Sequence, residues 1–278
     1  MTFSRALLPL DGSDFSKHSV DLLKAVQSEG AAVTLLQVVP GPEAVRDAEQ
    51  YLEAVAGSCL GEATTLVRVS DEPAEQVLKE VEQGNFDLVV LMTHGRGGLK
   101  RWVWGSVAEH VVRHCPIPLL LGTPPREGVK EPTAKKILVP LDGSTLADSV
   151  LQHVQGLCLS QGAEAVLFSA AWVEPSHNPL AYIRELDAAS AHAKEVLESR
   201  EAALAKEGVK VSSLSKRGEA ASSILEAAAE SGADMIAMTT HGRTGVTRWL
   251  LGSVAERVLR ASPLPVLLIR PPGQEASR

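Results

Sequence analysis

The sequence predicts an α/β protein made of two tandem open sheets, each with five parallel strands and helices on both faces. The first observation is that short patterns occur twice in the 278 residues. These are ALLPLDGS at 6–13 and ILVPLDGS at 137–144, THGR at 93–96 and 240–243, and GSVAE at 105–109 and 252–256. The second is that apolar runs alternate with stretches of helical periodicity in each copy, which is typical of a parallel sheet covered on both faces.

In the first copy, continuous apolar runs predict the strands and helical spacing predicts the helices. The strands are expected at 5–11, 31–39, 62–70, 86–93 and 117–122, and the helices at 14–28, 43–57, 73–84 and 104–114. Val20, Leu22, Leu23 and Val26 give the first helix its apolar face, with Ser13 or Asp14 as its cap and an end near Gly30. Pro73 suits the first turn of the third helix.

The second copy repeats this order with a longer second helix. Its strands are expected at 136–142, 165–172, 209–215, 234–240 and 264–270, and its helices at 145–158, 180–206, 219–231 and 250–261. The offset between copies is 131 residues at Asp11 and Asp142 but 147 at His94 and His241. We therefore expect the 16 extra residues to lengthen the helix that follows the second strand.

These patterns divide the chain into two domains, at 1–124 and 133–278. Residues 123–133 (TPPREGVKEPT) are rich in proline and charge and are expected to form a linker.

The repeated loops predict the order of the strands. LDGS follows the first strand and THGR follows the fourth, so both lie at carboxyl ends. Ligands of open α/β sheets bind outside these ends, where the strand order reverses. If both loops serve one ligand, strands one and four are neighbours and the order is 3-2-1-4-5.

The fifth strand is then an edge of each sheet. PIPLLLG and PLPVLLI are apolar edges flanked by proline, and such edges seek partners. The simplest arrangement pairs the two fifth strands into an intramolecular pseudo-dimer. A further homodimer of whole chains stays open.

Composition argues against several partners. A net charge of −7 and an aromatic content of 4% disfavour nucleic acid and anionic membranes, which need a basic face. No apolar run approaches the ~20 residues of a membrane span, and the N-terminus lacks the apolar core of a signal peptide. The three cysteines are scattered without metal spacing, and two have apolar surroundings. We expect a cytoplasmic protein.

A glycine-rich loop in each copy has the composition of an anion cradle. Gly95-Arg96-Gly97-Gly98 follows a strand and precedes a helix headed by Gly105-Ser106. The second copy has Gly242-Arg243-Thr244-Gly245 and then Gly252-Ser253. Glycines let backbone N–H groups approach phosphate oxygens, and a helix N-terminus adds donors and a positive dipole end. Ser106 and Ser253 are expected at the N-cap positions, where each also offers a hydroxyl. In the alternative interpretation, the glycines only make a turn and each serine only caps its helix.

Asp11 and Asp142 end the first strand of each copy in the sequence Pro-Leu-Asp-Gly-Ser. A carboxylate there can accept hydrogen bonds from a ribose or an adenine amino group, or meet a metal bound to phosphates. It can also cap the following helix, and the two roles can coexist.

Nearly the whole chain resembles the universal stress protein family in its tandem, ATP-binding form. Nucleotide-binding members carry Gly-x-x-Gly, nine residues, then Gly-Ser/Thr, after a first-strand Pro-x-Asp. Gly95, Gly105 and Ser106 match this pattern, as do Gly242, Gly252 and Ser253. Met92 and Thr239 replace its first glycine, which predicts a more crowded nucleotide or a changed backbone angle.

The resemblance implies a Rossmann-like fold of the adenine nucleotide alpha hydrolase type that binds ATP with Mg²⁺. Pro9, Asp11 and Val38, with Pro140, Asp142 and Ala170, are implied to hold the adenosine. The implied phosphate contacts are Gly95, Arg96, Gly98, Gly105 and Ser106 in the first copy and Gly242, Arg243, Gly245, Gly252 and Ser253 in the second. The neighbouring candidates are Met92, Thr93, His94, Val107, Thr239, Thr240, His241 and Val254.

Three functions are consistent with these patterns. The first is a nucleotide-dependent regulatory or stress-response protein with one ATP site per copy. The second is a slow ATPase or phosphotransferase, although the Walker lysine loop is missing from the sequence. The third is a nucleotide-free scaffold whose loops are structural. We assign no catalytic residue and no metal site; His110 and His114 share a helix face but have no evident third ligand.

Overall fold

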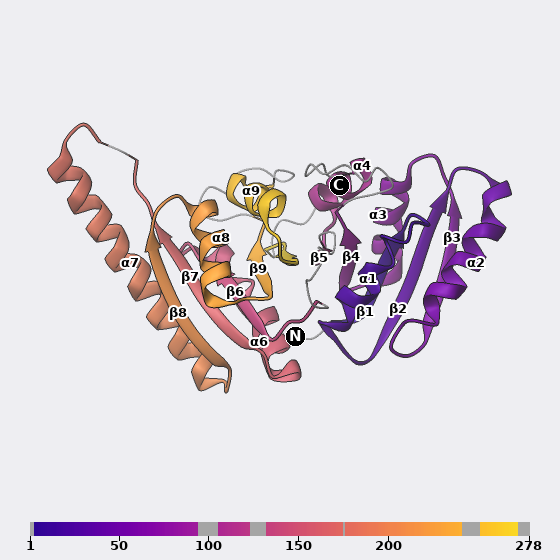
Figure 1. The fold of residues 1–278 in the computed structure, drawn as a ribbon, viewed down its shortest axis with the longest axis horizontal. Helices are drawn as coiled ribbons and strands as arrows, with labels where there is room; N and C mark the ends of the chain where they lie inside the picture. Colours follow the sequence, from indigo (N-terminus) through magenta and orange to yellow (C-terminus); the bar gives the residue numbers. More distant parts are fainter. Residues whose placement is uncertain (1–2, 94–104, 123–131, 175, 241–250, 272–278) are drawn as a thin grey trace. The chain divides into compact units, whose positions relative to one another are not determined.

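A computed structural model describes residues 3–93, 105–122, 132–174, 176–240 and 251–271. The first copy alternates strands and helices throughout (Figure 1). Its strands are β1 (Phe3–Leu10), β2 (Gln27–Val39), β3 (Ala63–Val69), β4 (Leu88–Met92) and β5 (Leu119–Gly122). Its helices are α1 (His18–Lys24), the short 3₁₀ helix η1 (Pro42–Ala44), α2 (Val45–Ala56), α3 (Pro73–Gly84) and α4 (Ser106–His114).

The second copy has the same alternation. Its strands are β6 (Lys136–Pro140), β7 (Glu164–Ala171), β8 (Lys210–Arg217), β9 (Met235–Thr239) and β10 (Val266–Ile269). Its helices are α5 (Thr145–Asp148), α6 (Leu151–Gln161), α7 (Pro179–Lys206), α8 (Ala220–Ser231) and α9 (Ser253–Ala261).

The strand order confirms the prediction made from the repeated loops. It is β3-β2-β1-β4-β5 in the first copy, and β8-β7-β6-β9-β10 in the second. Crossovers between parallel strands are right-handed, so helices on connections that run in opposite directions cover opposite faces. This places α1 and α2 on one face of the first sheet and α3 and α4 on the other.

Contacts divide the chain into two compact units. One holds residues 2–133 with 263–268, and the other holds 134–262 with 269–278. Within the first unit, Val266, Leu267 and Leu268 pair antiparallel with Leu121, Leu120 and Leu119. The predicted domain boundaries, the pseudo-dimer and a further homodimer stay predictions, and residues 123–131 of the predicted linker lie outside the described residues.

At the reversal of strand order, β1 pairs with β4, and β6 with β9, over a very short ladder. Ala6 and Leu7 pair with Leu88 and Val89, and the β6–β9 ladder is equally short. Pro9 and Pro140, farther along β1 and β6, have no N–H to donate. Neighbouring strands therefore separate toward their carboxyl ends, which is where a crevice can form.

An aspartate holds the amino ends of these same strands together. Asp87, just before β4, accepts hydrogen bonds from Ser4 N (2.8 Å), Ser4 Oγ (2.7 Å) and Arg5 N (2.9 Å). Asp234, just before β9, accepts from Lys135 N and Lys136 N, each at 3.1 Å. The same device thus sets the register at the reversal point in both copies.

The largest disagreement with the sequence prediction is the first helix. The helix expected over 14–28 is only α1, and β2 begins at Gln27 instead of residue 31. The β1–β2 register shifts between Phe3 and Arg5, and Gly30 lies in this irregular stretch with a φ of 75°. Gly30 therefore serves a bulged strand and does not end a helix. Neither Ser13 nor Asp14 caps α1, whose N-cap is Lys17.

One helix of the second copy differs from the prediction, and another explains why the second copy is longer. The helix expected over 145–158 is divided into α5 and α6, and α6 continues to Gln161, where Gly162 follows with a φ of 67°. α7 has 28 residues whereas α2 has 12, so this helix accounts for the extra residues of the second copy as predicted.

The core is aliphatic and lies between the sheets and their helices. Leu7, Leu8, Leu35 and Leu88 are fully buried in the first copy, and Phe168 is the largest fully buried side chain of the second. In the described part of the chain, no helix combines the length and apolarity that crossing a bilayer requires.

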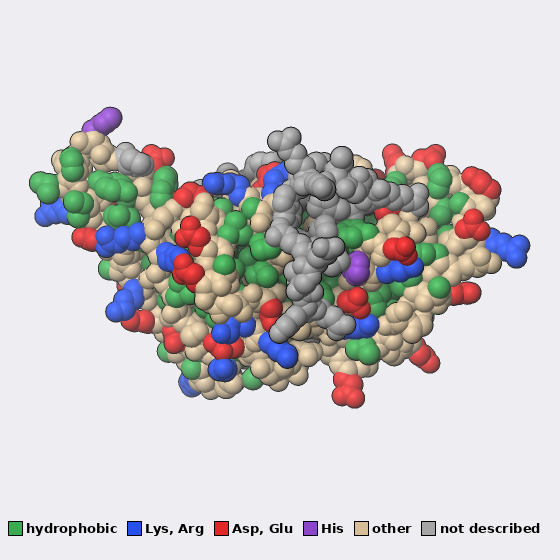
Figure 2. Space-filling model, viewed as in Figure 1, with side chains coloured by type: hydrophobic (Ala, Val, Ile, Leu, Met, Phe, Trp, Pro, Cys, Tyr) green, Lys and Arg blue, Asp and Glu red, His purple; other side chains and the backbone are tan. Residues whose placement is uncertain are grey.

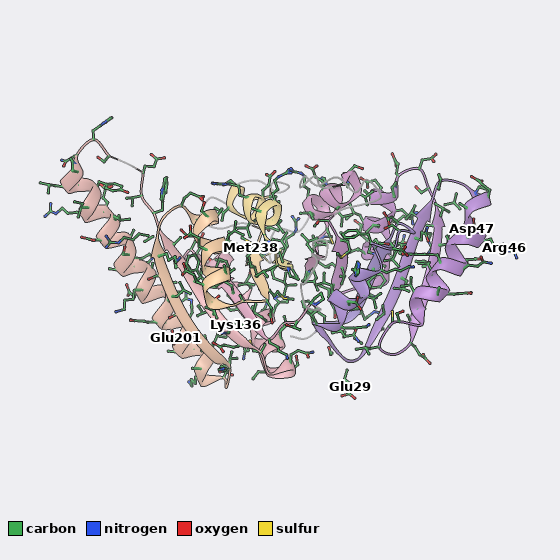
Figure 3. The ribbon with its side chains drawn as sticks, in the orientation of Figure 1. Glu29, Arg46, Asp47, Lys136, Glu201 and Met238 are labelled. Carbon is green, nitrogen blue, oxygen red and sulfur yellow. The ribbon has the colours of Figure 1, made fainter. Side chains whose placement is uncertain are left out.

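We predict that Asp87→Ala lowers the free energy of unfolding by about 1–3 kcal/mol, because hydrogen bonds to a charged acceptor are lost and two backbone donors lose their partner. The change is measured by urea unfolding. The control is Glu29→Ala, an exposed carboxylate that points away from the sheet (Figure 3), with an expected change below about 0.5 kcal/mol. Equal stability of the two variants would contradict the role given to Asp87.

The three thiols give a second prediction. Cys115 and Cys158 are buried, and burial raises the pKa of Cys158 to about 11. Burial also raises the pKa of Cys59, which is only partly covered. Because the thiolate is the reactive form, we expect Cys115 and Cys158 to react with a disulfide reagent at pH 8 only after unfolding, with Cys59 reacting first. Rapid reaction of all three cysteines in the native protein would refute this prediction.

Candidate functional site

A cavity of about 430 Å³ lies at the carboxyl ends of β1 and β4 in the first copy. β1, β2 and β4 supply part of its wall, and the starts of α3 and α4 supply most of the rest. Its lining residues are Pro9, Leu10, Asp11, Ser16, Leu36, Val38, Pro40, Pro73, Val77, Leu91, Met92, Thr93, Gly105, Ser106, Val107 and Ala108. It therefore occupies the position that the reversal of strand order predicts for a ligand.

The second copy has a cavity of about 470 Å³ in the equivalent place. Its lining residues are Pro140, Leu141, Asp142, Ala147, Phe168, Ala170, Trp172, Ala220, Ile224, Met238, Thr239, Thr240, Gly252, Ser253, Val254 and Ala255. Strand register and the repeated motifs match every one of these to a residue of the first cavity. Figure 3 labels one of them, Met238 on β9. We call the two spaces cavity one and cavity two.

Asp11 and Asp142 have the same local geometry at the mouths of β1 and β6. Oδ1 of Asp11 accepts from Ser13 N at 3.0 Å and Ser13 Oγ at 2.5 Å. Oδ1 of Asp142 accepts from Ser144 N at 2.9 Å and Ser144 Oγ at 2.6 Å, and Ser144 in turn caps α5 by accepting from Ala147 N. Each aspartate thus fixes the turn after its strand while its side chain lines the cavity.

The helices that begin at the cavities have no side-chain cap. The N-cap residues are Gly105 for α4 and Gly252 for α9, and neither helix start receives a capping hydrogen bond from a side chain. Ser106 and Ser253 were expected at the N-cap; that prediction was wrong, since each is the first helical residue and is exposed. The first N–H groups of an uncapped helix are donors without an intrahelical partner, and here they face a cavity.

The two glycines do not need their special backbone freedom. Gly105 has φ −63° and ψ 147°, and Gly252 has φ −60° and ψ 145°, both in a region open to every residue. What glycine supplies at these points is the absence of a side chain next to the helix start. This feature suits the close approach of a ligand to the backbone.

Met92 and Thr239, which replace the first glycine of the expected pattern, are accommodated differently. Met92 pairs with Gly122 on β5, and a Cβ added to Gly122 would lie 2.5 Å from the sulfur of Met92. The missing side chain of Gly122 therefore makes room for the methionine. Thr239 needs less space, and Ile269 occupies the position equivalent to Gly122 in the second copy. Both residues still line their cavities.

The segment after the first strand is held differently in the two copies. Tyr51 of α2 donates to Ser13 O at 2.9 Å and lies 2.8 Å from Oγ of the cavity residue Ser16, and burial raises the pKa of Tyr51. In the second copy Ala147 replaces Ser16, and Arg200 of α7 binds Asp148 with Nη2–Oδ2 at 2.6 Å. Thus the helix after strand two secures this segment in both copies.

Within each copy, a different pair of side chains joins the helices on the other face of the sheet. His110 Nε2 lies 2.7 Å from Glu75 Oε1, and the His110 ring stacks on His114 at 4.2 Å. Arg257 replaces His110 in the second copy and binds Glu219 at 2.7 Å. His110 thus contacts α3, whereas His114 stacks on His110 within α4.

The structure places all the described candidate nucleotide-binding residues around the two cavities. Around cavity one these are Pro9, Asp11, Val38, Met92, Thr93, Gly105, Ser106 and Val107. Around cavity two they are Pro140, Asp142, Ala170, Thr239, Thr240, Gly252, Ser253 and Val254. His94, Gly95, Arg96, Gly98, His241, Gly242, Arg243 and Gly245 lie outside the described residues. Their contacts stay predictions.

Several other lining residues were missed because no repeated motif contains them. Pro73 and Val77 of α3, like Ala220 and Ile224 of α8, come from the helix after the third strand. Trp172 was missed as well, at a position where the first copy has Pro40. Pro73 was recognised only as a helix start, and that helix start is what brings it to the cavity.

Comparison with known proteins agrees with the geometry. The model of the universal stress protein family matches residues 2–121 and 133–270. A universal stress protein of Methanocaldococcus jannaschii is 33% identical over 146 residues, which cover 51% of this chain and 85% of the relative. One of Mycolicibacterium smegmatis is 24% identical over 240 residues, which cover 82% of this chain and 78% of the relative.

A solved structure extends this likeness of fold across both copies. The crystal structure of a universal stress protein from Archaeoglobus fulgidus has a TM-score of 0.70 at 23% identity and covers 98% of this chain and 97% of its own. Two family matches in series and an α/β fold shared over the full length lead to one conclusion. The chain belongs to the universal stress protein family and contains two of its domains in tandem.

Proposed function

We propose that this protein is a nucleotide-dependent regulatory protein of the stress response that binds one ATP in each copy, at cavities one and two. The observation that carries the proposal is the residue-by-residue match of the two linings. Packing needs alone do not preserve an open space of about 430 Å³ and another of about 470 Å³ at equivalent places. Both volumes lie in the range of about 300–1,000 Å³ that is usual for small-molecule sites.

The chemistry of each lining suits the parts of a nucleotide. Asp11 or Asp142 offers a carboxylate to the ribose hydroxyls, and the apolar residues beside Val38 or Ala170 suit the base. The uncapped starts of α4 and α9 offer backbone N–H groups and a positive dipole end to the phosphates. Bound Mg²⁺ would neutralise part of the phosphate charge.

A regulatory role is favoured over catalysis by the same lining. Among the described residues around each cavity, the aspartate is the titratable side chain, and the others are apolar, glycine or hydroxyl residues. Such a set binds and orients a nucleotide but offers little general acid–base chemistry. We therefore propose slow or no turnover. A cytoplasmic location is part of the proposal and rests on the three free cysteines.

The test replaces the two helix-cap glycines. Valine fits the backbone angles of Gly105 and Gly252, so we expect the double variant Gly105→Val with Gly252→Val to fold and its new side chains to obstruct the phosphates. Isothermal titration of the wild type should give two ATP per chain, and the double variant should bind at least about tenfold more weakly, the equivalent of about 1.5–3 kcal/mol of lost charge-assisted hydrogen bonds. Each single variant should retain one site.

The control is Gly57→Val, at the end of α2, where φ is −61° and the nearest atom to an added Cβ is 3.7 Å away. Circular dichroism establishes that each variant is folded. Undiminished ATP affinity in a folded double variant would refute the proposal. A wild type that binds no ATP would favour a nucleotide-free scaffold, and phosphate release above background would favour a slow ATPase.

A further inference from the structure

The two cavities differ most along the second strand of each sheet. Side chains two residues apart on a strand share a face. In the second copy this face carries Phe168, Ala170 and, directly after β7, Trp172, and all three line cavity two. In the first copy the equivalent residues are Leu36, Val38 and Pro40. Cavity two therefore has a small residue between two aromatic ones, whereas the described lining of cavity one contains no aromatic side chain.

Trp172 is exposed to an unusual degree for a residue of its size. It is 51% exposed although it lines the cavity, whereas Phe168 at the inner end of the face is 1% exposed. An indole that remains half in water forgoes much of the gain that burial of its large apolar surface offers. A flat ligand ring laid against it recovers that gain.

The position of Trp172 favours a small ligand over a protein partner. Apolar side chains also gather on the N-terminal end of α7 (Figure 2), where Leu180 is 75% and Ile183 is 51% exposed. Neither of these residues lines cavity two. Trp172, in contrast, lines cavity two directly after β7, and β6 separates β7 from β9, the strand that precedes α9. A ligand that rests its phosphates on the start of α9 can therefore extend its base toward β7.

We propose that Trp172 stacks on the nucleobase and makes cavity two the tighter and the more base-selective of the two nucleotide sites. Ala170, smaller than Val38, leaves the space beside the indole into which a purine ring fits. Cavity one holds its nucleotide mainly through the sugar and phosphates. This inference rests on the proposed function, and it turns two equivalent sites into two specialised ones.

The experiment measures cavity two alone, in a Gly105→Val chain. Isothermal titration compares ATP with inorganic triphosphate, which has no base. Base–aromatic stacking predicts that adding Trp172→Ala weakens ATP binding about 5- to 150-fold and leaves triphosphate binding within about twofold. Trp172→Phe keeps an aromatic face and should lose much less. The control is Leu159→Ala on α6, an exposed apolar residue (56%) away from the cavity.

A second comparison needs no change at Trp172. The Gly105→Val chain, with cavity two open, should bind ATP more tightly than the Gly252→Val chain, with cavity one open, and should gain more affinity from the base. Unchanged ATP affinity in Trp172→Ala, or an equal loss for triphosphate, would overturn the inference and leave the proposed function standing. A wild type that binds no ATP would overturn both.

Discussion

The reversal of strand order between β1 and β4, repeated between β6 and β9, determines where the helices and the cavities of each copy lie. The paired strands share a two-residue ladder, are held at their amino ends by Asp87 or Asp234, and part at their carboxyl ends. Because crossovers are right-handed, the reversal also sends the later helices to the opposite face. The starts of α4 and α9 consequently face the gap, and backbone donors come to lie across from a carboxylate.

Duplication makes this constraint informative, because the two copies share their motifs but differ in much of the remaining sequence. Features common to both are the aspartate after the first strand, the uncapped helix start and the glycine at its N-cap. Features that differ are the supports behind them: Tyr51 against Arg200, and His110 with Glu75 against Arg257 with Glu219. Packing partners have diverged while the lining has kept its pattern, which is expected where a ligand, more than the core, limits change.

Much of the fold follows from the sequence because its rules are local. Pro73 and the left-handed Asn85 bracket α3 at the residues that periodicity predicts. The end of α1 was predicted too far along the chain because its apolar spacing continues into β2. That these residues form a bulged strand depends on their pairing with β1. The site was located by motifs that repeat, but Trp172, Val77 and Ser16 carry no motif. Which side chain at a strand end faces a cavity depends on the register between neighbouring strands and on the position of the neighbouring helix. Neither can be predicted from the sequence of a single segment.

We propose that the two strand-order reversals create two adenine-nucleotide sites. A crystal structure of the full chain grown with ATP and Mg²⁺ tests it most directly. We expect adenosine in cavity one and cavity two, with the ribose at Asp11 and Asp142 and the phosphates at the starts of α4 and α9. Nucleotide bound elsewhere on the chain, with both cavities empty at saturating ATP, would contradict it.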